Sequence, residues 1–291
     1  MATSENSGME GQNKPRDSIP PYNEDIEKDI TPARTLLEEY SKIPPDQVIA
    51  HIHAVRDKAW KIHPYPCLGR FRFLDLSISL HPLYPTVLAR LKDSSPPQTF
   101  LDLGCCFGQD LRRLVADGAR GENLYGADLR LEFLELGYEL FQDKGSLKAH
   151  FLEGDVFEED DEAEGGKHLS KLDGKIDVIY AASFLHLFAW EEQVRAGTRM
   201  VRLMRDDSLV FGRQVGTTKP GVYARRTDNR PRYSHDPDSF QKLWDVIGEK
   251  TGTRWKVMAE LQKVKGWQSE EQEVHGTGDS KMMRFEVHRL K

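Results

Sequence analysis

The sequence predicts an α/β fold in which helices cover both faces of a mainly parallel β-sheet. From Gln98 onward, short apolar runs alternate with amphipathic helical segments, which is the pattern of a parallel sheet. A glycine-containing turn follows the first apolar run, at the position where open α/β sheets bind their ligands. The last two apolar runs are joined without a long crossover helix, which predicts an antiparallel final strand.

The composition limits the class of protein. The 291 residues, 38% of them hydrophobic, suffice for one large domain with a substantial core. A formal net charge of −6 argues against nucleic acid as a partner, because nucleic-acid binding needs a basic surface. Three cysteines without framework spacing indicate a reducing compartment, and no cysteine-histidine cluster indicates a metal site. With no apolar signal core and no apolar run of membrane-spanning length, we expect a soluble, cytoplasmic protein.

The N-terminal third is expected to be a helical cap beside the sheet. Residues 1–18 are polar and predicted to be disordered, and residues 19–97 are predicted to form the cap. One helix should begin at Thr31-Pro32 with Thr31 as its N-cap, and a second after Pro44-Pro45 with Asp46 as its cap. A third is predicted at Tyr84–Lys92. The stretch from residue 68 to residue 83 has no clear pattern.

The remaining residues, 98–291, should form the sheet domain. Seven strands are predicted, at Thr99–Leu103, Leu124–Asp128, Ala149–Glu153, Ile176–Ala182, Ser208–Val215, Arg254–Leu261 and Met282–Leu290. Helices are predicted at Gly108–Asp117, Leu131–Gln142, Trp190–Met204 and Pro237–Lys250, the last capped by Ser234 or Asp236. An acidic run between Val156 and Gly174 predicts a solvated loop followed by a short helix.

The turn after the first strand, Asp102 to Gly108, is the first candidate ligand contact. Gly104 and Gly108 let the backbone turn sharply and approach a ligand closely. Cys106 stands where a dinucleotide-binding G-x-G-x-x-G turn has its middle glycine. A βα turn without any ligand is the alternative for this motif taken alone.

Two aspartates follow the next two strands, and parallel strands bring both to the same sheet edge. Asp128 stands where a carboxylate can accept hydrogen bonds from ribose hydroxyls, although it can also cap the helix that begins at Leu131. Asp155 can accept from the exocyclic amine of adenine, with Val156 or Phe157 packed on the ring, although a simple turn aspartate explains it too.

These motifs, together with Ile176–Ala182, resemble the successive motifs of class I S-adenosylmethionine-dependent methyltransferases. The resemblance implies a Rossmann-like fold with a seven-stranded, mostly parallel sheet, an antiparallel last strand, and S-adenosylmethionine as the cofactor of residues 98–291. It implies cofactor contacts from Asp102, Gly104, Cys106, Gly108, Asp128, Leu129, Asp155, Val156, Phe157, Tyr180 and Ala181. Cys106 departs from the family pattern by adding a side chain where the backbone meets the cofactor.

Two further segments, Tyr65–Phe71 and Phe184–Phe188, are similar to a narrower group, the fungal methyltransferases of austinol-type meroterpenoid pathways. Those enzymes methyl-esterify the carboxyl group of a farnesylated aromatic polyketide acid. The similarity implies a small hydrophobic carboxylic acid as the substrate. The sequence does not determine the oligomeric state, for which a homodimer is our working expectation.

The acceptor chemistry decides which residues matter. A carboxylate, with a pKa of about 4, is ionised at pH 7 and needs only positioning, whereas a phenol, with a pKa of about 10, needs a base. His186 can serve as that base or hydrogen-bond the acceptor, or it can be a packed histidine. Arg213 can pair with a carboxylate, and Arg70 can reach the carboxylate of the cofactor if its segment folds over the site. Candidate substrate contacts are Phe184, Gln214 and Tyr223.

Several alternatives stay open. A phenol O-methyltransferase would use His186 as base. A nicotinamide-dependent oxidoreductase would also use an acid such as Asp128, but this chain lacks the glycine spacing of a dinucleotide-binding turn. A non-catalytic protein on the same fold would not need the intact motifs. The basic cluster from Arg225 to Arg232 is either a solvated loop or part of the acceptor site, and it also leaves a nucleic-acid or protein substrate open.

Overall fold

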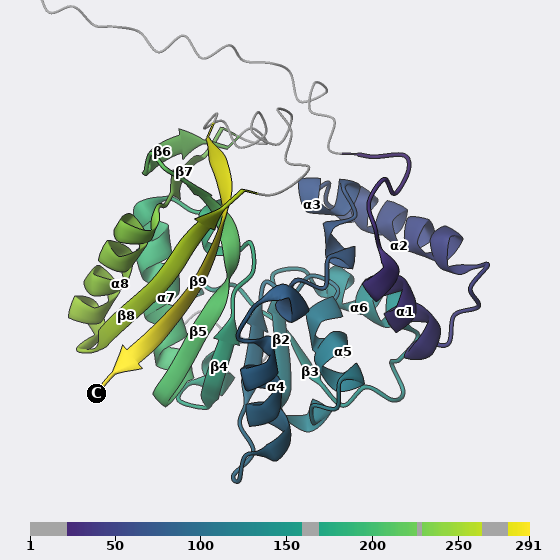
Figure 1. Ribbon diagram of the computed structural model, residues 1–291, viewed down its shortest axis with the longest axis horizontal. Helices are drawn as coiled ribbons and strands as arrows, with labels where there is room; N and C mark the ends of the chain where they lie inside the picture. Colours follow the sequence, from purple (N-terminus) through teal and green to yellow (C-terminus); the bar gives the residue numbers. More distant parts are fainter. Residues whose placement is uncertain (1–21, 159–168, 226–228, 264–278) are drawn as a thin grey trace, which may run out of the picture.

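The computed structural model describes residues 22–158, 169–225, 229–263 and 279–291, and a seven-stranded sheet runs through it (Figure 1). The strand order is β3-β2-β1-β4-β5-β9-β8. Strands β1 to β5 are parallel, and β9 runs antiparallel to both of its neighbours, β5 and β8. The predicted fold class is therefore confirmed. The strands are β1 Phe100–Leu103, β2 Leu124–Asp128, β3 His150–Glu153, β4 Ile176–Tyr180, β5 Met204–Thr217, β8 Arg254–Gln262 and β9 Ser280–Leu290.

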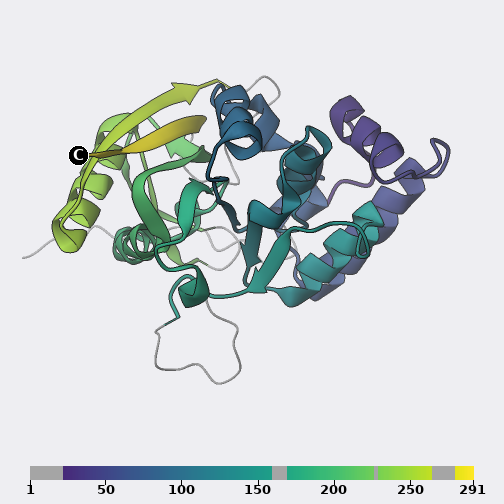
Figure 2. The same cartoon turned by 90° about the horizontal axis from the view of Figure 1, so that it is seen from below.

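Helices cover both faces of this sheet (Figure 2). The α-helices are α1 Thr31–Glu39, α2 Val48–Ile62, α3 Pro66–Gly69, α4 Tyr84–Asp93, α5 Gln109–Ala116, α6 Leu131–Phe141, α7 Trp190–Leu203 and α8 Pro237–Thr251. Short 3-10 helices lie at η2 Arg72–Leu74, η3 Ser77–Leu80, η4 Gly121–Asn123, η5 Leu169–Leu172 and η6 Leu185–Leu187. Alternate residues of a strand enter different cores: Ile179 and Val210 pack with α7 and α8, whereas Val178 and Leu209 pack with α4 and α5.

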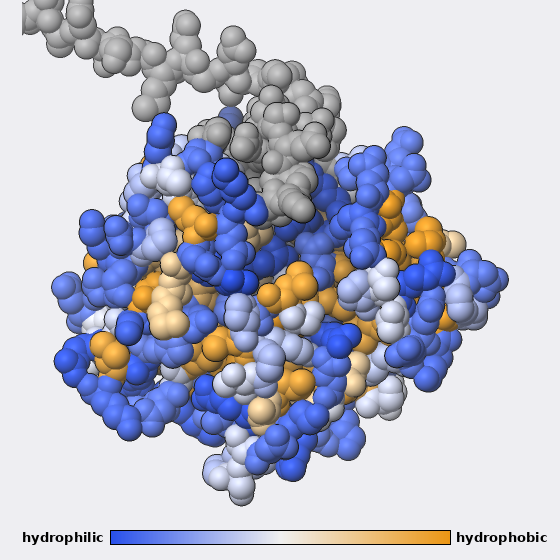
Figure 3. Space-filling model, in the orientation of Figure 1, coloured by the Kyte–Doolittle hydropathy of each residue, from blue (hydrophilic) through white to orange (hydrophobic). Residues whose placement is uncertain are grey.

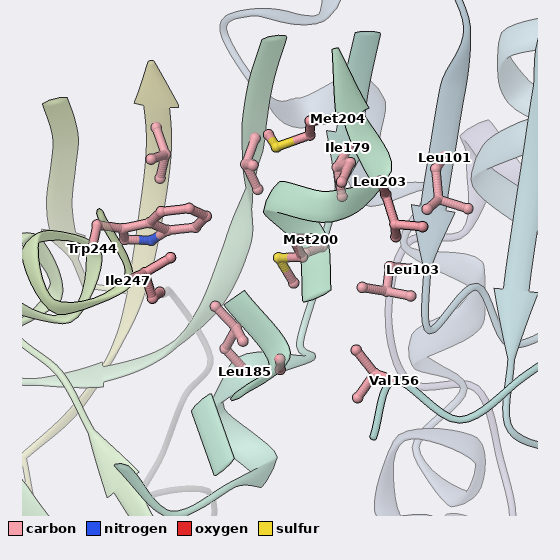
Figure 4. Close-up of a cluster of buried hydrophobic side chains, with 14 of the residues drawn as sticks. Leu101, Leu103, Val156, Ile179, Leu185, Met200, Leu203, Met204, Trp244 and Ile247 are labelled. Atoms are coloured by element: carbon pink, nitrogen blue, oxygen red, sulfur yellow. The ribbon is translucent and has the colours of Figure 1, made fainter. Parts of the chain in front are cut away.

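The larger core ties the ends of three strands together (Figure 4). Leu103 at the end of β1, Val156 after β3 and Leu185 after β4 all belong to it, together with Met200 of α7 and Trp244 of α8. The loops at the carboxyl edge of the sheet are therefore anchored on one packed cluster, which positions the polar groups between them.

The helices before the sheet pack against the start of the α/β unit. Buried side chains of α1, α2 and α3 form a cluster with α6 and with Phe107 of the glycine turn. The imidazole of His51 in α2 lies 3.0 Å from the carbonyl oxygen of Leu140 in α6. The cap thus touches the turn itself. The predicted tail, residues 1–18, lies outside the described residues, as does most of the acidic run after Glu158.

Two predicted caps are wrong and one is confirmed. Thr31 is the first residue of α1 and not its N-cap, because Asp29 ties down both its amide and its hydroxyl and places Ile30 at the cap position. Helix α2 begins at Val48 with Gln47 as N-cap, so Asp46 lies outside it. Asp236 caps α8 as predicted, accepting a 2.8 Å hydrogen bond from the amide of Ser239.

A two-stranded sheet, β6 Gly221–Ala224 and β7 Pro231–Ser234, occupies the region predicted to be a loop. Each strand has four residues, too few for an alternating pattern to reveal it. The hairpin is fixed to the body of the protein where the amide of Tyr233 donates to the carbonyl of Phe188 at 2.9 Å.

No helix in the described parts of the chain is both long and apolar enough to cross a membrane. Hydrophilic residues cover most of the face seen in Figure 3, with apolar residues in smaller groups among them.

Candidate functional site

The glycine turn between β1 and α5 has a left-handed backbone at three positions. Gly104, Cys106 and Gly108 have φ angles of 78°, 55° and 63°. The amides of Gly104 and Cys105 both donate to the carbonyl of Ala127 in β2, at 2.8 and 3.0 Å, and tie the turn to the neighbouring strand. Cys106 thus adopts the conformation of the glycine it replaces, at a cost of about 1–2 kcal/mol that a glycine would not bear.

Asp128, at the end of β2, stabilises this turn. Its Oδ2 accepts a 2.8 Å hydrogen bond from the amide of Cys106, and its Oδ1 accepts a 3.2 Å bond from the amide of Arg130. Burial raises the pKa of Asp128, and these backbone donors counteract that increase. The capping alternative is wrong, because Arg130 occupies the N-cap position of α6. Next to this carboxylate, the apolar side chain of Leu129 is 55% exposed.

A buried ion pair that sequence reasoning missed supports the same turn from below. Nη1 of Arg112 donates to the carbonyl of Phe107 at 2.6 Å, and Nε and Nη2 contact the two oxygens of Asp143 at 2.8 and 2.9 Å. The two side chains are 0% and 3% exposed. The hydroxyl of Tyr40, in the cap, also donates to Asp143. No sequence signal separates Arg112 from Arg113, its neighbour, which forms a partly exposed pair with Asp117.

Two further carboxylates are buried beside the turn. Asp102, in β1, is 3% exposed, and its Oδ2 has no hydrogen-bond partner among the described residues. Burial, and then the charges of Asp110 and Asp128, raise its pKa well above the usual range. Asp110 accepts from the amide of Ile78 at 3.0 Å, and burial raises its pKa to about 6. An unpaired, buried carboxylate oxygen at the turn suits a ligand that brings an N–H donor or a positive charge.

The third predicted aspartate lies at the end of β3. Asp155 is exposed, and its Oδ1 accepts from the amide of Phe157 at 2.9 Å, so the expected turn is present. Val156 is buried in the large core, whereas Phe157 is half-buried with its ring 4.9 Å from that of Phe188. Leu129, Asp155 and Phe157 therefore keep accessible surface at this edge.

The residues at the end of β4 and directly after it pack either in the core or on the glycine turn. Tyr180, the last residue of β4, is fully buried, with its hydroxyl 2.8 Å from that of Ser77. Ala181 is buried as well and donates its amide to Phe211 at 3.0 Å. Phe184, a predicted substrate contact, packs on Gly104, where an added Cβ would lie 2.9 Å from its ring.

Arg213 and Gln214 face opposite sides of β5, because consecutive strand residues alternate. Arg213 is 17% exposed and faces the cap, where Nη2 lies 3.4 Å from Oδ2 of Asp75 and Nη1 lies 3.9 Å from Sδ of Met282. Asp75 is already paired with Lys28 and, at 2.9 Å, with Arg72. Gln214 is completely buried, on the same face of β5 as Val210, which packs in the core with α7 and α8. The two residues therefore cannot contact the same small group of a ligand.

The remaining predicted residues lie around η6 and the cap. His186 is buried in η6, and Arg70 is half-buried directly after α3. Tyr223, in β6, donates its hydroxyl to the carbonyl of Lys219 at 2.6 Å.

The basic cluster is not simply a solvated loop. Arg225 donates to the carbonyl of Leu187 in η6 at 3.2 Å. Arg232 is buried in β7, and that burial, followed by the charge of Arg225, lowers its pKa to about 10. Arg226 lies outside the described residues. Arg225 therefore packs on the segment that follows β4 and Arg232 is buried, whereas Arg230 is exposed.

Two family models match the chain. Residues 21–74 match the N-terminal domain of meroterpenoid methyltransferases, and residues 100–207 match a methyltransferase domain. These ranges correspond to the first part of the helical cap and to the sheet from β1 to the start of β5.

Characterised relatives cover most of the chain. It is 46% identical to the O-methyltransferase atr3 of Stereocaulon alpinum, over 90% of this chain and 74% of that protein. It is 39% identical to the asnovolin E/chermesin D methyltransferase nvfJ of Aspergillus novofumigatus, over 78% and 79%. Among solved structures, the fold resembles a Burkholderia thailandensis 1,6-didemethyltoxoflavin-N1-methyltransferase, with a TM-score of 0.51 and 14% identity over 86% of this chain and 92% of that one.

Proposed function

The chain belongs to the family of fungal meroterpenoid methyltransferases, and we propose that it methyl-esterifies the carboxylate of a hydrophobic meroterpenoid intermediate. It is an S-adenosylmethionine-dependent methyltransferase, as its matched domain and relatives are. The relative from Aspergillus novofumigatus carries two named acceptors, asnovolin E and chermesin D, in its name. The acceptor of this chain, and the carboxylate as its reacting group, are the proposal.

The residues at the carboxyl edge of the sheet fit the cofactor. S-adenosylmethionine supplies a methyl group bound to a positively charged sulfur. The unpartnered Oδ2 of Asp102 can accept a hydrogen bond from the ammonium group of the cofactor. The left-handed turn lets the backbone approach the cofactor closely. The exposed side chain of Leu129 offers an apolar surface for a base. We assign the cofactor to Asp102, Gly104, Cys106, Gly108, Asp128, Leu129, Asp155, Val156, Phe157, Tyr180, Ala181 and Arg70.

In this assignment, Asp128 both stabilises the glycine turn and binds the ribose of the cofactor. Each of its oxygens already accepts one backbone hydrogen bond. A carboxylate offers about four lone-pair sites, so the remaining two can receive the two ribose hydroxyls. The backbone bonds fix the carboxylate in position before the ligand arrives.

Arg213 carries the proposal for the acceptor. The amide of Ser183 donates to the carbonyl of Arg213 at 2.6 Å, which places this residue level with the chain directly beyond β4. Its guanidinium has five N–H donors, but its contacts are a long ion pair with Asp75 and a weak contact with Met282. Asp75 already has ion pairs with Lys28 and Arg72, so Arg213 is not needed to neutralise it. Arg213 can therefore bind the carboxylate of a ligand through two N–H groups.

A carboxylate acceptor needs placement and no base. Its oxygen must stand in line behind the methyl group at a distance of about 3–3.5 Å. With a pKa of about 4 it is already ionised at pH 7. Arg213 would orient it, and His186 would contribute a hydrogen bond at most.

Substitution of Arg213 tests this assignment. We expect Arg213→Gln to lower kcat/KM for a farnesylated aromatic acid by about 10- to 100-fold, because one charged hydrogen-bonded contact is worth about 1.5–3 kcal/mol. Affinity for S-adenosylhomocysteine, measured by calorimetry, should stay unchanged. Arg205→Gln, an exposed arginine on the same strand, is the control. Unchanged kcat/KM in Arg213→Gln would refute the assignment.

His186→Ala separates the carboxylate from a phenol as acceptor. A positioning role predicts a loss of less than about tenfold, whereas a general base contributes about 10²- to 10⁴-fold. A loss in the larger range with unchanged cofactor affinity would favour the phenol O-methyltransferase instead.

A further inference from the structure

Gln214 is a completely buried glutamine whose side-chain amide has no hydrogen-bond partner among the described residues. Both Nε2 and Oε1 lack a partner, and the residue is 0% exposed. Buried polar groups are nearly always paired, because an unpaired donor or acceptor has lost its water and gained nothing in return. An amide with both ends unpaired therefore needs an explanation.

The surroundings place this amide beside the acceptor region. Gly212 and Gly216 lie on the same face of β5, on either side of Gln214. A Cβ at Gly212 would lie 2.5 Å from the carbonyl oxygen of Ala181, after β4, and a Cβ at Gly216 would lie 2.8 Å from that of His235, after β7. The two glycines let these segments come against the strand, on the face of β5 to which strand alternation also directs the Gln214 side chain.

A second buried glutamine shows that this region can satisfy such a group. Gln193, in α7, is also 0% exposed. Its Nε2 donates to the carbonyls of Phe188 and Tyr233 at 3.0 and 2.9 Å, and its Oε1 lies 3.1 Å from Nε2 of His235. The two glutamines are equally buried, but both amide atoms of Gln193 have hydrogen-bond partners and neither amide atom of Gln214 has one among the described residues. Ser234, one residue before His235, has a buried hydroxyl that also lacks a partner among the described residues.

We propose that the amide of Gln214 binds a hydroxyl group of the methyl acceptor. A hydroxyl can accept from Nε2 and donate to Oε1, whereas a carboxylate or a carbonyl would leave Oε1 unpaired. Because Gln214 and Arg213 face opposite sides of β5, this hydroxyl and the carboxylate held by Arg213 belong to different parts of the acceptor. This inference rests on the proposed function for the identity of the ligand as the acceptor.

Because Gln214 is fully covered in the structure, a ligand reaches its amide only when a segment on this face of β5 moves.

The first test compares the thermal unfolding of two ligand-free variants. Replacing an unpaired buried amide by an apolar side chain of similar size is neutral or stabilising, whereas removing a paired one leaves its partners unsatisfied. We expect Gln214→Met to keep or raise Tm, and Gln193→Met, the matched control, to lower it. A Tm for Gln214→Met that falls as far as that of Gln193→Met would mean a structural amide and would overturn the inference.

The second test measures discrimination between acceptors. A farnesylated aromatic hydroxy acid and its analogue with hydrogen in place of the hydroxyl are titrated, in the presence of S-adenosylhomocysteine, into wild type and Gln214→Met. Wild type should bind the hydroxy acid at least about tenfold more tightly, and the ratio should fall to about one in the variant. A wild-type ratio near one, or a ratio that the substitution leaves unchanged, contradicts the inference. Because the ratio does not depend on which oxygen is methylated, a product other than a methyl ester would refute the proposed function alone.

Discussion

Replacing Asp143 with asparagine tests whether the buried pair with Arg112 supports the glycine turn. The substitution keeps the shape of the side chain but removes the negative charge that compensates the guanidinium of Arg112, a side chain that is 0% exposed. Removing one partner of a buried ion pair costs about 3–5 kcal/mol. Arg112 keeps its bond to Phe107 and lies 4.7 Å from the Phe141 ring, so we expect the lower end, about 3 kcal/mol.

The assay is urea unfolding followed by tryptophan fluorescence, with Tyr40→Phe as control. That control removes one hydrogen bond to Asp143 and should cost about 1 kcal/mol. The double variant Arg112→Met/Asp143→Leu replaces the pair by apolar groups and should recover most of the loss, since such replacements are often neutral. A loss below about 1 kcal/mol in Asp143→Asn, or a double variant less stable than either single one, would refute the account of this pair.

Three further predictions follow from the same geometry. Asp128→Ala removes the acceptor for the amide of Cys106, so calorimetry should show at least about tenfold weaker binding of S-adenosylhomocysteine, and equal binding would count against the ribose assignment. Gly137→Ala places a Cβ against the carbonyl oxygen of Phe107, and we expect about 1–3 kcal/mol lower stability by chemical unfolding; an unchanged midpoint would disprove this contact. Burial lowers the pKa of His235 to about 3, below its value of about 6.5 in the unfolded chain. The neutral imidazole therefore stabilises the fold fully above pH 6.5, and this stabilisation is lost as the pH falls. The free energies of unfolding at pH 5 and pH 7 should differ by about 2 kcal/mol more in wild type than in His235→Gln.

The sheet could be predicted from sequence because its signals are local. The strand at Leu124–Asp128 was predicted at the residues where β2 lies, and β1, β3 and β9 differ by only one or two residues. Fully buried strands give short apolar runs bounded by turn residues, and the alternation with helices follows from that pattern alone. The left-handed turn was predictable for the same reason, since Gly104 and Gly108 mark it in the sequence.

The supporting contacts could not be predicted, because they join residues far apart in the chain. Tyr40 and Asp143 are separated by 103 positions, and nothing near either residue indicates the other. Arg213 and Gln214 were both assigned to the acceptor, but only the structure shows that one faces the cap and the other a buried slot. Pairing and burial of single polar side chains depend on tertiary packing, which a local pattern does not contain.

The most direct measurement of the central proposal is the fate of the transferred methyl group. The enzyme is incubated with S-adenosylmethionine labelled in its methyl group and a farnesylated aromatic hydroxy acid, and the isolated product is hydrolysed in alkali. A methyl ester releases the label as methanol, which is the result that we predict. A product that retains the label through hydrolysis is a methyl ether, and it would contradict the carboxylate as the methyl acceptor.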